Sequence, residues 1–153
     1  MNPEEKARLE IDAQLTRCGW NVQTKDKVNL SASRGVAICE LSFARGEPDY
    51  TLFVDGRALG TVEAKPVGHS LVGVEEQSTK YVTGVPPGLP AWHNPLPFCY
   101  ESTGEETRFT NRLDPDDFDY APFSQRGGLG KAHQLFGDKF PSLLDELNLK
   151  LVA

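Results

Sequence analysis

The sequence has no long apolar run, few cysteines and no excess of basic residues. No stretch approaches the roughly 20 apolar residues that cross a bilayer, and the N-terminus MNPEEKARLE is acidic where a secretory signal is basic and then apolar. The three cysteines are widely spaced and form neither a disulfide framework nor a Cys-x-x-Cys metal motif. We therefore expect a cytoplasmic protein without membrane contact, in which Cys18, Cys39 and Cys99 are reduced core residues.

Acidic residues outnumber basic ones, and the net charge is −6. Proteins that hold nucleic acid by bulk electrostatics depend on many Lys and Arg contacts with phosphates, so the charge counts against that mode of binding. A metal-dependent nuclease remains compatible, because its active site needs clustered carboxylates. Hydrophobic residues make up 39% of the 153 residues and charged residues 25%, which is typical of one compact globular domain.

The N-terminal segment has the start signals of a helix over residues 2–18. Asn2 is a capping residue, Pro3 suits the first helical position, and Glu5 completes a capping box. Apolar side chains at helical spacing mark one face: Ala7, Ile11, Leu15 and Cys18. Glu4 falls on that face, where an acid is costly unless it is paired or binds a metal; a solvated position at the helix end is the favoured alternative.

The rest of the chain alternates strand-like and helix-like segments. We expect a polar loop over 21–35, a strand over 36–43, a hairpin over 49–65, a helix over 70–84 ended by Gly84, and a Pro/Gly-rich loop over 85–97. A second hairpin over 98–111 and one or two short terminal helices follow. This order predicts an α/β fold, a mixed sheet flanked by helices. We assign residues 1–125 to the main domain and 126–153 to a C-terminal helical extension.

The first hairpin brings opposite charges together. A two-residue turn at Asp55-Gly56 pairs Val54 with Arg57 and, by counting outward, places Asp49 opposite Val62 and adjacent to Glu63. Lys65 shares a strand face with Glu63, because side chains alternate with a period of two.

Asp49, Glu63 and Lys65 form the strongest candidate site. Phosphodiester hydrolysis uses carboxylates that hold Mg²⁺ against the phosphate and a cation or base near the attacking water. A Glu and a Lys that alternate along a solvated strand are common, so the Glu-x-Lys pair alone would favour a structural interpretation. Polar residues that interrupt two paired apolar strands at one level favour a site instead.

These segments resemble a known motif. PD at 48–49, thirteen residues, and then EAK at 63–65 are similar to the motif of the PD-(D/E)XK nuclease superfamily, and Gln77-x-x-x-Tyr81 resembles the Gln-x3-Tyr element of its RecB-like branch. Longer stretches, including RGVAICELSF, LVGVEEQSTKYVTGVP and PFCYESTGEETRFTN, resemble the N-terminal endonuclease domain of the type I restriction enzyme R subunit. The similarity covers residues 4 to about 112 and thins beyond 113.

The resemblance implies a restriction-endonuclease-like PD-(D/E)XK core and a role for each matching residue. Asp49 and Glu63 bind Mg²⁺, with Mn²⁺ as a possible substitute, and Lys65 assists the attacking water or stabilises developing charge. Gln77 and Tyr81, one helical turn apart, lie beside the site and contact DNA or position the lysine. An acidic residue of the first helix often completes the metal site, and Glu4 fits that place; Glu40 is a weaker candidate, for which a structural ion pair is the better interpretation.

The resemblance also implies partners. The family's full R subunit includes an ATP-driven translocase and works on DNA with specificity and methyltransferase subunits. RGGLGKA at 126–132 is not a phosphate loop, because Gln125 replaces the first glycine and Ala132 cannot ligate Mg²⁺. We therefore expect no ATP site in this chain, and expect a fragment or a stand-alone relative of the nuclease domain.

Two alternatives to a sequence-nonspecific DNA endonuclease stay open at this point. One is a nuclease-fold docking or DNA-binding module that is inactive without its assembly partners. The other is an unrelated α/β interaction domain in which the charged strand pair is only structural.

Overall fold

The computed structural model describes residues 2–17, 19–71, 81–91, 95–96 and 98–105, and the backbone of residues 107–111. Within these ranges the elements follow the order α1 (Pro3–Arg17), β1 (Asn21–Thr24), the 3-10 helix η1 (Lys25–Lys27), β2 (Gly35–Cys39), β3 (Tyr50–Val54), β4 (Arg57–Ala64), β5 (Phe98–Ser102) and β6 (Thr107–Asn111). Cys18, most of the helix predicted over 70–84, the predicted terminal helices and the boundary at 125/126 lie outside the described residues.

Helix α1 begins with the predicted capping box. The Asn2 side chain accepts the Glu5 backbone N–H over 2.8 Å, and the Glu5 carboxylate accepts the Asn2 N–H over 3.0 Å. Two donors that a helix start would leave without partners are thereby satisfied. The predicted apolar face is buried at Ala7, Ile11 and Leu15, so the sequence signals for this helix are confirmed.

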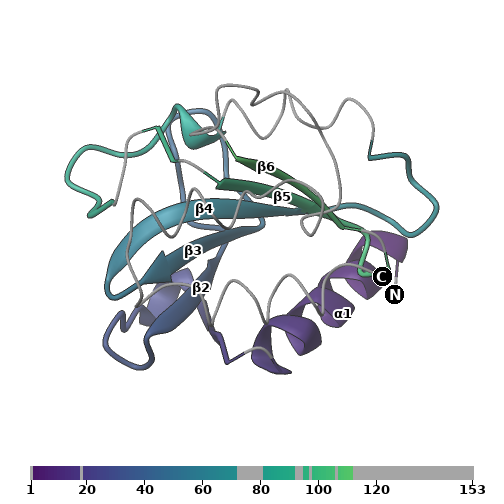
Figure 1. Ribbon diagram of the computed structural model, residues 1–153, viewed down its shortest axis with the longest axis horizontal. Coiled ribbons are helices and arrows are strands. Elements are labelled where there is room, and N and C mark those ends of the chain that lie inside the picture. The colour runs from purple at the N-terminus through teal and green to yellow at the C-terminus, as the bar shows by residue number, and fades with distance from the viewer. Residues whose placement is uncertain are drawn as a thin grey trace.

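The strands form one six-stranded sheet in the order β1-β2-β3-β4-β5-β6 (Figure 1). β1 is parallel to β2 and β4 is parallel to β5, whereas the other neighbouring pairs are antiparallel. The predicted α/β class with a mixed sheet is therefore confirmed, as are both predicted hairpins. The loop expected over 21–35 is wrong in part, because residues 21–24 pair as strand β1. Its sequence NVQT gave no alternating apolar signal, and each residue pairs with one fifteen positions further along the chain.

The first hairpin contains a bulge that the sequence analysis did not predict. Its turn is as expected, with positive φ at Asp55 (49°) and Gly56 (80°) and Val54 opposite Arg57. Beyond Phe53 the register shifts by one residue, and Leu59 is the extra residue on β4. Tyr50, not Asp49, consequently lies opposite Val62.

The bulge determines the face of the sheet on which Asp49 lies. A shift of one residue moves a side chain to the opposite face of a sheet. With the bulge, Asp49 precedes Tyr50 at the level of Glu63 and shares its face. Unbulged pairing would have left the two carboxylates on opposite faces.

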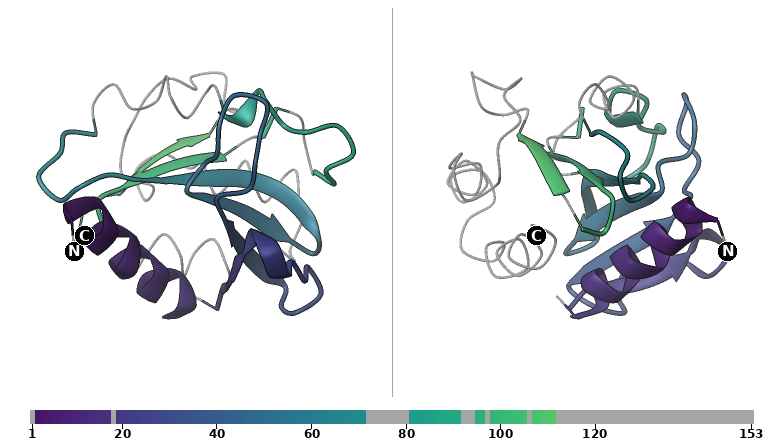
Figure 2. Two further views of the ribbon diagram at one scale, coloured as in Figure 1. Left: turned by 180° about the vertical axis from the view of Figure 1, so that it is seen from behind. Right: turned by 90° about the vertical axis from the view of Figure 1, so that its right-hand side faces the viewer.

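Two apolar clusters cover the two faces of the sheet. The cluster facing α1 includes Ile11, Leu15, Trp20, Tyr50, Leu52, Val62, Ala64, Phe98 and Tyr100; Figure 2 shows α1 lying along this side. The cluster on the other face includes Val36, Ile38, Phe43, Phe53, Val82, Leu96 and Cys99. Because Val62 and Ala64 face α1, alternation places Glu63 on the face away from the helix.

The described part of the 70–84 segment agrees with the predicted helix end. Residues 81 and 82 are helical, and the Gly84 N–H donates to the Tyr81 carbonyl over 2.9 Å. Cys39 and Cys99 are both reduced, and Cys99 is fully buried. A bilayer-spanning helix needs roughly 20 apolar residues, and none of the helical segments in the described ranges meets that requirement.

Candidate active site

Asp49 and Glu63 meet where β3 begins and β4 ends. The Asp49 backbone N–H donates to Glu63 Oε1 over 3.3 Å, and the Ala64 N–H donates to Asp49 Oδ2 over 2.8 Å. The two carboxyl groups also act on each other's pKa. The expected adjacency of these two acids is therefore present, through a different register from the one the turn alone predicts.

Glu63 is the more buried acid of the pair, with 3% of its surface exposed. Burial, followed by repulsion from the Asp49 carboxylate, raises the pKa of Glu63 to about 8, against a smaller lowering by the Lys65 charge. Burial also raises the pKa of Asp49, while the Ala64 N–H and the Arg8 charge act in the opposite direction. The pair therefore favours a bound proton or cation.

Lys65 continues β4 by one residue toward β5. Its backbone N–H donates to the Ser102 carbonyl over 2.8 Å, so the extended backbone persists past Ala64. Alternation then places the Lys65 side chain on the face of Glu63, and its charge acts on that carboxylate. The three residues of the candidate motif lie on one face at one end of the sheet.

Two further acidic residues, Glu4 and Glu40, are candidate ligands. Glu4 is exposed in the first turn of α1, and its charge contributes to the raised pKa of Asp49. Its role as a ligand stays a prediction. Glu40 makes an ion pair with Arg8, with 2.5 Å between Oε1 and the guanidinium, so the structural interpretation of Glu40 is confirmed.

Only one residue of the Gln-x3-Tyr element is described. Gln77 lies outside the described residues. Tyr81 is half-buried and packs against the cluster on the face of Glu63. Its ring lies over the loop that leads to Asp49, since a Cβ added to Gly46 would come within 2.8 Å of Tyr81 Cε1.

Two residues near the pair, Glu101 and Arg8, carry no signal in the sequence that marks them as part of the site. Glu101 on β5 lies directly opposite Glu63 in the parallel register and is 1% exposed. The segment FCYES indicates that Glu101 shares a strand face with Cys99. Its position opposite Glu63, however, depends on how the chain crosses from β4 to β5, which no local signal fixes. Arg8 on α1 acts electrostatically on Asp49, and only the docking of α1 brings it there.

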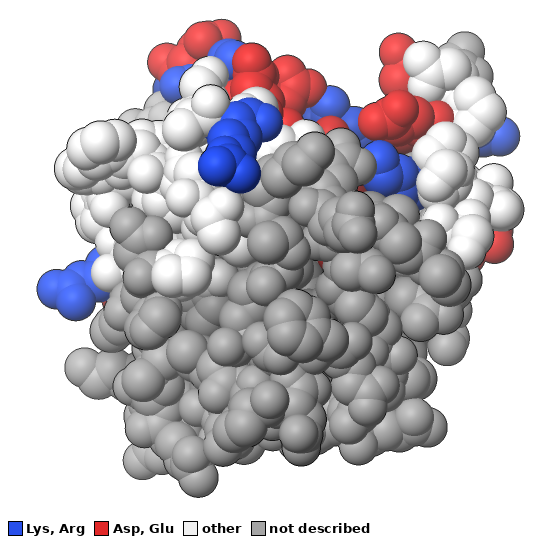
Figure 3. All heavy atoms as spheres, turned by 90° about the horizontal axis from the view of Figure 1, so that it is seen from above, with Lys and Arg blue, Asp and Glu red and all other residues white. Residues whose placement is uncertain are grey.

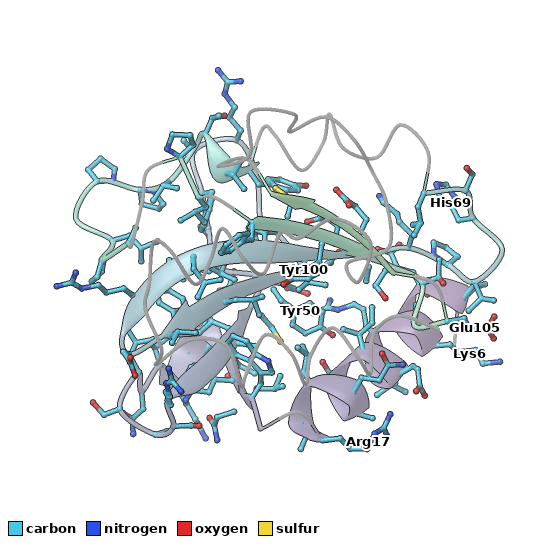
Figure 4. All side chains as sticks on the ribbon, viewed as in Figure 1. Lys6, Arg17, Tyr50, His69, Tyr100 and Glu105 are labelled. Carbon is cyan, nitrogen blue, oxygen red and sulfur yellow. The ribbon has the colours of Figure 1, made fainter. Side chains whose placement is uncertain are left out.

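A hollow of about 610 Å³ lies between the first half of α1 and the chain beyond β4 and β5. Its lining includes Lys6 and Glu105, which lie at the same end of the molecule in Figure 4. Neither Asp49 nor Glu63 lines it. The carboxylate pair and this hollow are therefore separate features of the molecule.

The donor set fits a small divalent cation. Within the described ranges, no three His, Cys, Asp or Glu side chains are grouped so that they could hold a metal ion. Mg²⁺ sites, however, commonly use one or two protein carboxylates and complete the shell with waters and substrate phosphate. Asp49 and Glu63 supply two such carboxylates, and a cation between them would relieve the repulsion that raises the pKa of Glu63.

Comparison with known proteins gives one result. Residues 21–118 match the family model described as type I restriction enzyme R protein N terminus. The chain belongs to that family. The match spans all six strands and the candidate motif, whereas α1 lies before it. No curated protein and no solved structure matches the chain significantly.

Membership of the R protein N-terminus family makes this a nuclease-related domain of the restriction-modification class. The resemblance noted in the sequence is thereby confirmed at the level of the family. Type I R proteins belong to multi-subunit restriction complexes that act on DNA.

Proposed function

We propose that this chain is the Mg²⁺-dependent endonuclease domain of a type I restriction enzyme R subunit, with a restriction-endonuclease-like PD-(D/E)XK core. It hydrolyses DNA phosphodiester bonds without reading sequence. The observation that supports this most directly is the Asp49–Glu63 pair, because a bulge places two mutually repelling carboxylates on one face, where an extended chain continues to Lys65.

Each residue has a distinct task in this proposal. Asp49 and Glu63 would hold Mg²⁺, or Mn²⁺ in its place, which would supply charge stabilisation at the phosphate and an activated water. Lys65 would assist the attacking water or stabilise charge that develops on the phosphate. Glu4 extends the metal site from α1. Gln77 and Tyr81 support the lysine or contact the DNA backbone.

Membership of the family supports the wider assignments of the proposal. The domain works in the cytoplasm within a complex that also contains specificity and methyltransferase subunits. ATP is used by the motor region of the full R subunit and not by this chain. Cleavage by the isolated chain is slow, because the complete enzyme delivers DNA to the site by translocation.

Nicking of supercoiled plasmid in Mg²⁺ or Mn²⁺ tests the proposal. We expect Lys65→Ala and Asp49→Asn to lower the nicking rate about a hundredfold or more. Lys27→Ala and Asp26→Asn are matched controls, because both residues are exposed in η1, and they should nick like the wild type. Full activity of Asp49→Asn would refute the proposal.

The same variants separate the proposal from its alternative. If the wild type does not nick but binds Mn²⁺ in a way that Asp49→Asn abolishes, the chain is a nuclease-fold module that needs its assembly partners. If it neither nicks nor binds Mn²⁺, the pair is structural and the nuclease proposal fails.

A further inference from the structure

Tyr50 connects the site to helix α1. It follows Asp49 directly and points to the opposite face, where it is fully buried. Its hydroxyl lies 2.5 Å from Asp12 Oδ1, to which it donates, and 3.0 Å from the Arg8 carbonyl oxygen. A hydrogen bond from a hydroxyl to a carboxylate is among the strong ones in proteins, so the start of β3 is held firmly against α1.

A second connection starts from the same turn of the helix. The Arg8 guanidinium pairs with Glu40 at 2.5 Å and lies 5.7 Å from the centre of the Tyr50 ring. Glu40 in turn donates its backbone N–H to the Asp49 carbonyl over 3.2 Å. Its φ of 55° lies in the left-handed region, which a non-glycine residue keeps only when its surroundings stabilise it.

These contacts hold Asp49 from two sides. Asp49 precedes the first residue of β3, so the regular ladder does not fix its backbone. Its carbonyl oxygen accepts the Glu40 N–H, and the next residue, Tyr50, is held by its hydrogen bond to Asp12. Both connections end on α1, which lies outside the residues that match the family.

We infer that Tyr50, Asp12, Arg8 and Glu40 form a brace that positions the Asp49 carboxylate for metal binding. We call this set the α1 brace. The inference rests on the proposed function, because it concerns the same metal site. The brace residues do not touch the metal; they set the orientation of Asp49 relative to Glu63, and residues that orient ligands in this way typically change metal affinity about tenfold or more when they are lost.

Tyr100 provides a matched control for Tyr50. Tyr50, Val62 and Tyr100 lie side by side on three neighbouring strands. Both tyrosines are buried in the cluster that faces α1 (Figure 4). Removing either hydroxyl deletes the same atom from the same layer, but only Tyr50 is part of the α1 brace.

The test measures Mn²⁺ binding by the full chain, from the electron paramagnetic resonance signal of free Mn²⁺. We expect Tyr50→Phe to raise the Kd about tenfold and Tyr100→Phe to leave it within about twofold. Urea unfolding of each variant confirms that the folded chain is being titrated. Equal Kd values for Tyr50→Phe, Tyr100→Phe and the wild type would overturn the inference.

A second pair of variants keeps the test decisive if Tyr50→Phe does not fold. Glu40→Gln breaks the brace at a half-exposed position, and Glu47→Gln removes an equal charge from the loop before Asp49, where Glu47 pairs with Lys25 at 3.2 Å. We expect Glu40→Gln to raise the Kd for Mn²⁺ clearly more than Glu47→Gln does. Equal effects would mean that charge alone matters, and the brace would be refuted.

Asp49→Asn distinguishes failure of the brace from failure of the proposed function. If Asp49→Asn abolishes Mn²⁺ binding while the brace variants bind like the wild type, only the brace is wrong. If Asp49→Asn binds normally, or the wild type does not bind Mn²⁺, the proposed metal site is wrong and the brace falls with it.

Discussion

Glu63 holds an ionisable group in an environment that disfavours its charge. It is 3% exposed, lies beside Asp49 and is opposite Glu101 across the parallel strand pair. A buried carboxyl normally either acquires a counter-charge or keeps its proton. Without metal, the raised pKa of Glu63 means that the folded chain retains a proton that an unfolded chain has already released.

This difference predicts that the metal-free chain loses stability as pH rises from about 4.5 to about 8. Across that window the folded state binds more protons than the unfolded state, so each rise in pH favours unfolding. We expect the loss in the free energy of unfolding to be roughly 2 to 4 kcal/mol. Urea unfolding in EDTA at several pH values measures it.

Two substitutions control this experiment. Glu63→Gln keeps the size of the side chain and should flatten the pH dependence, whereas Glu105→Gln, at an exposed position, should leave it intact. An unchanged slope in Glu63→Gln would show that another group is responsible.

At the scale of elements, the hairpin depends on a close approach between β4 and β5. A Cβ placed on Gly60 would come within 2.6 Å of the Phe98 carbonyl oxygen, and a backbone atom cannot rotate away. We expect Gly60→Ala to lower the free energy of unfolding by about 3 kcal/mol, measured by urea denaturation.

Gly56→Ala is the comparison for that substitution. Gly56 sits in the turn of the same hairpin with φ of 80°, and nothing lies within 4 Å of an added Cβ. Its substitution should cost only about 1 kcal/mol, from backbone strain. Equal costs at the two glycines would contradict the steric explanation for Gly60.

Local sequence signals predicted those elements that depend on local contacts. The capping box at Asn2 and Glu5, the turn at Asp55-Gly56 and the helix end at Gly84 each involve residues within a few positions of one another. Strand β1 was missed because its four residues, three of them polar, become a strand at the sheet edge only through their partner.

The candidate site was predictable only in part for the same reason. The motif named Asp49, Glu63 and Lys65, but their common face depends on a bulge at Leu59. The level of Glu101 and the approach of Arg8 depend on how β5 and α1 dock. These are contacts between distant segments, which periodicity and spacing do not encode.

At the scale of the whole molecule, the charge distribution argues for weak binding of DNA by the isolated chain. The described part of the surface in Figure 3 carries acidic and basic side chains next to one another, and the net charge is −6. A protein that contacts few phosphates releases few counterions, so its affinity depends weakly on salt.

We therefore expect the logarithm of the DNA association constant to fall with the logarithm of salt concentration with a slope shallower than about −2. Fluorescence anisotropy of a labelled duplex in Ca²⁺, between 50 and about 200 mM salt, would measure it. A steep slope would mean that this chain, and not its partners, holds the DNA in the complex.

The bulge at Leu59 also has an arithmetic consequence for recognising such sites in other sequences. In an unbulged hairpin with a two-residue turn, residues that face each other are always separated by an even number of residues. Thirteen residues separate Asp49 from Glu63, an odd number, so the two acids can share a level only if one strand carries an extra residue. When two acidic residues flank a two-residue turn, an odd number of residues between them therefore predicts a bulge if they share a level. An even number is compatible with a regular hairpin.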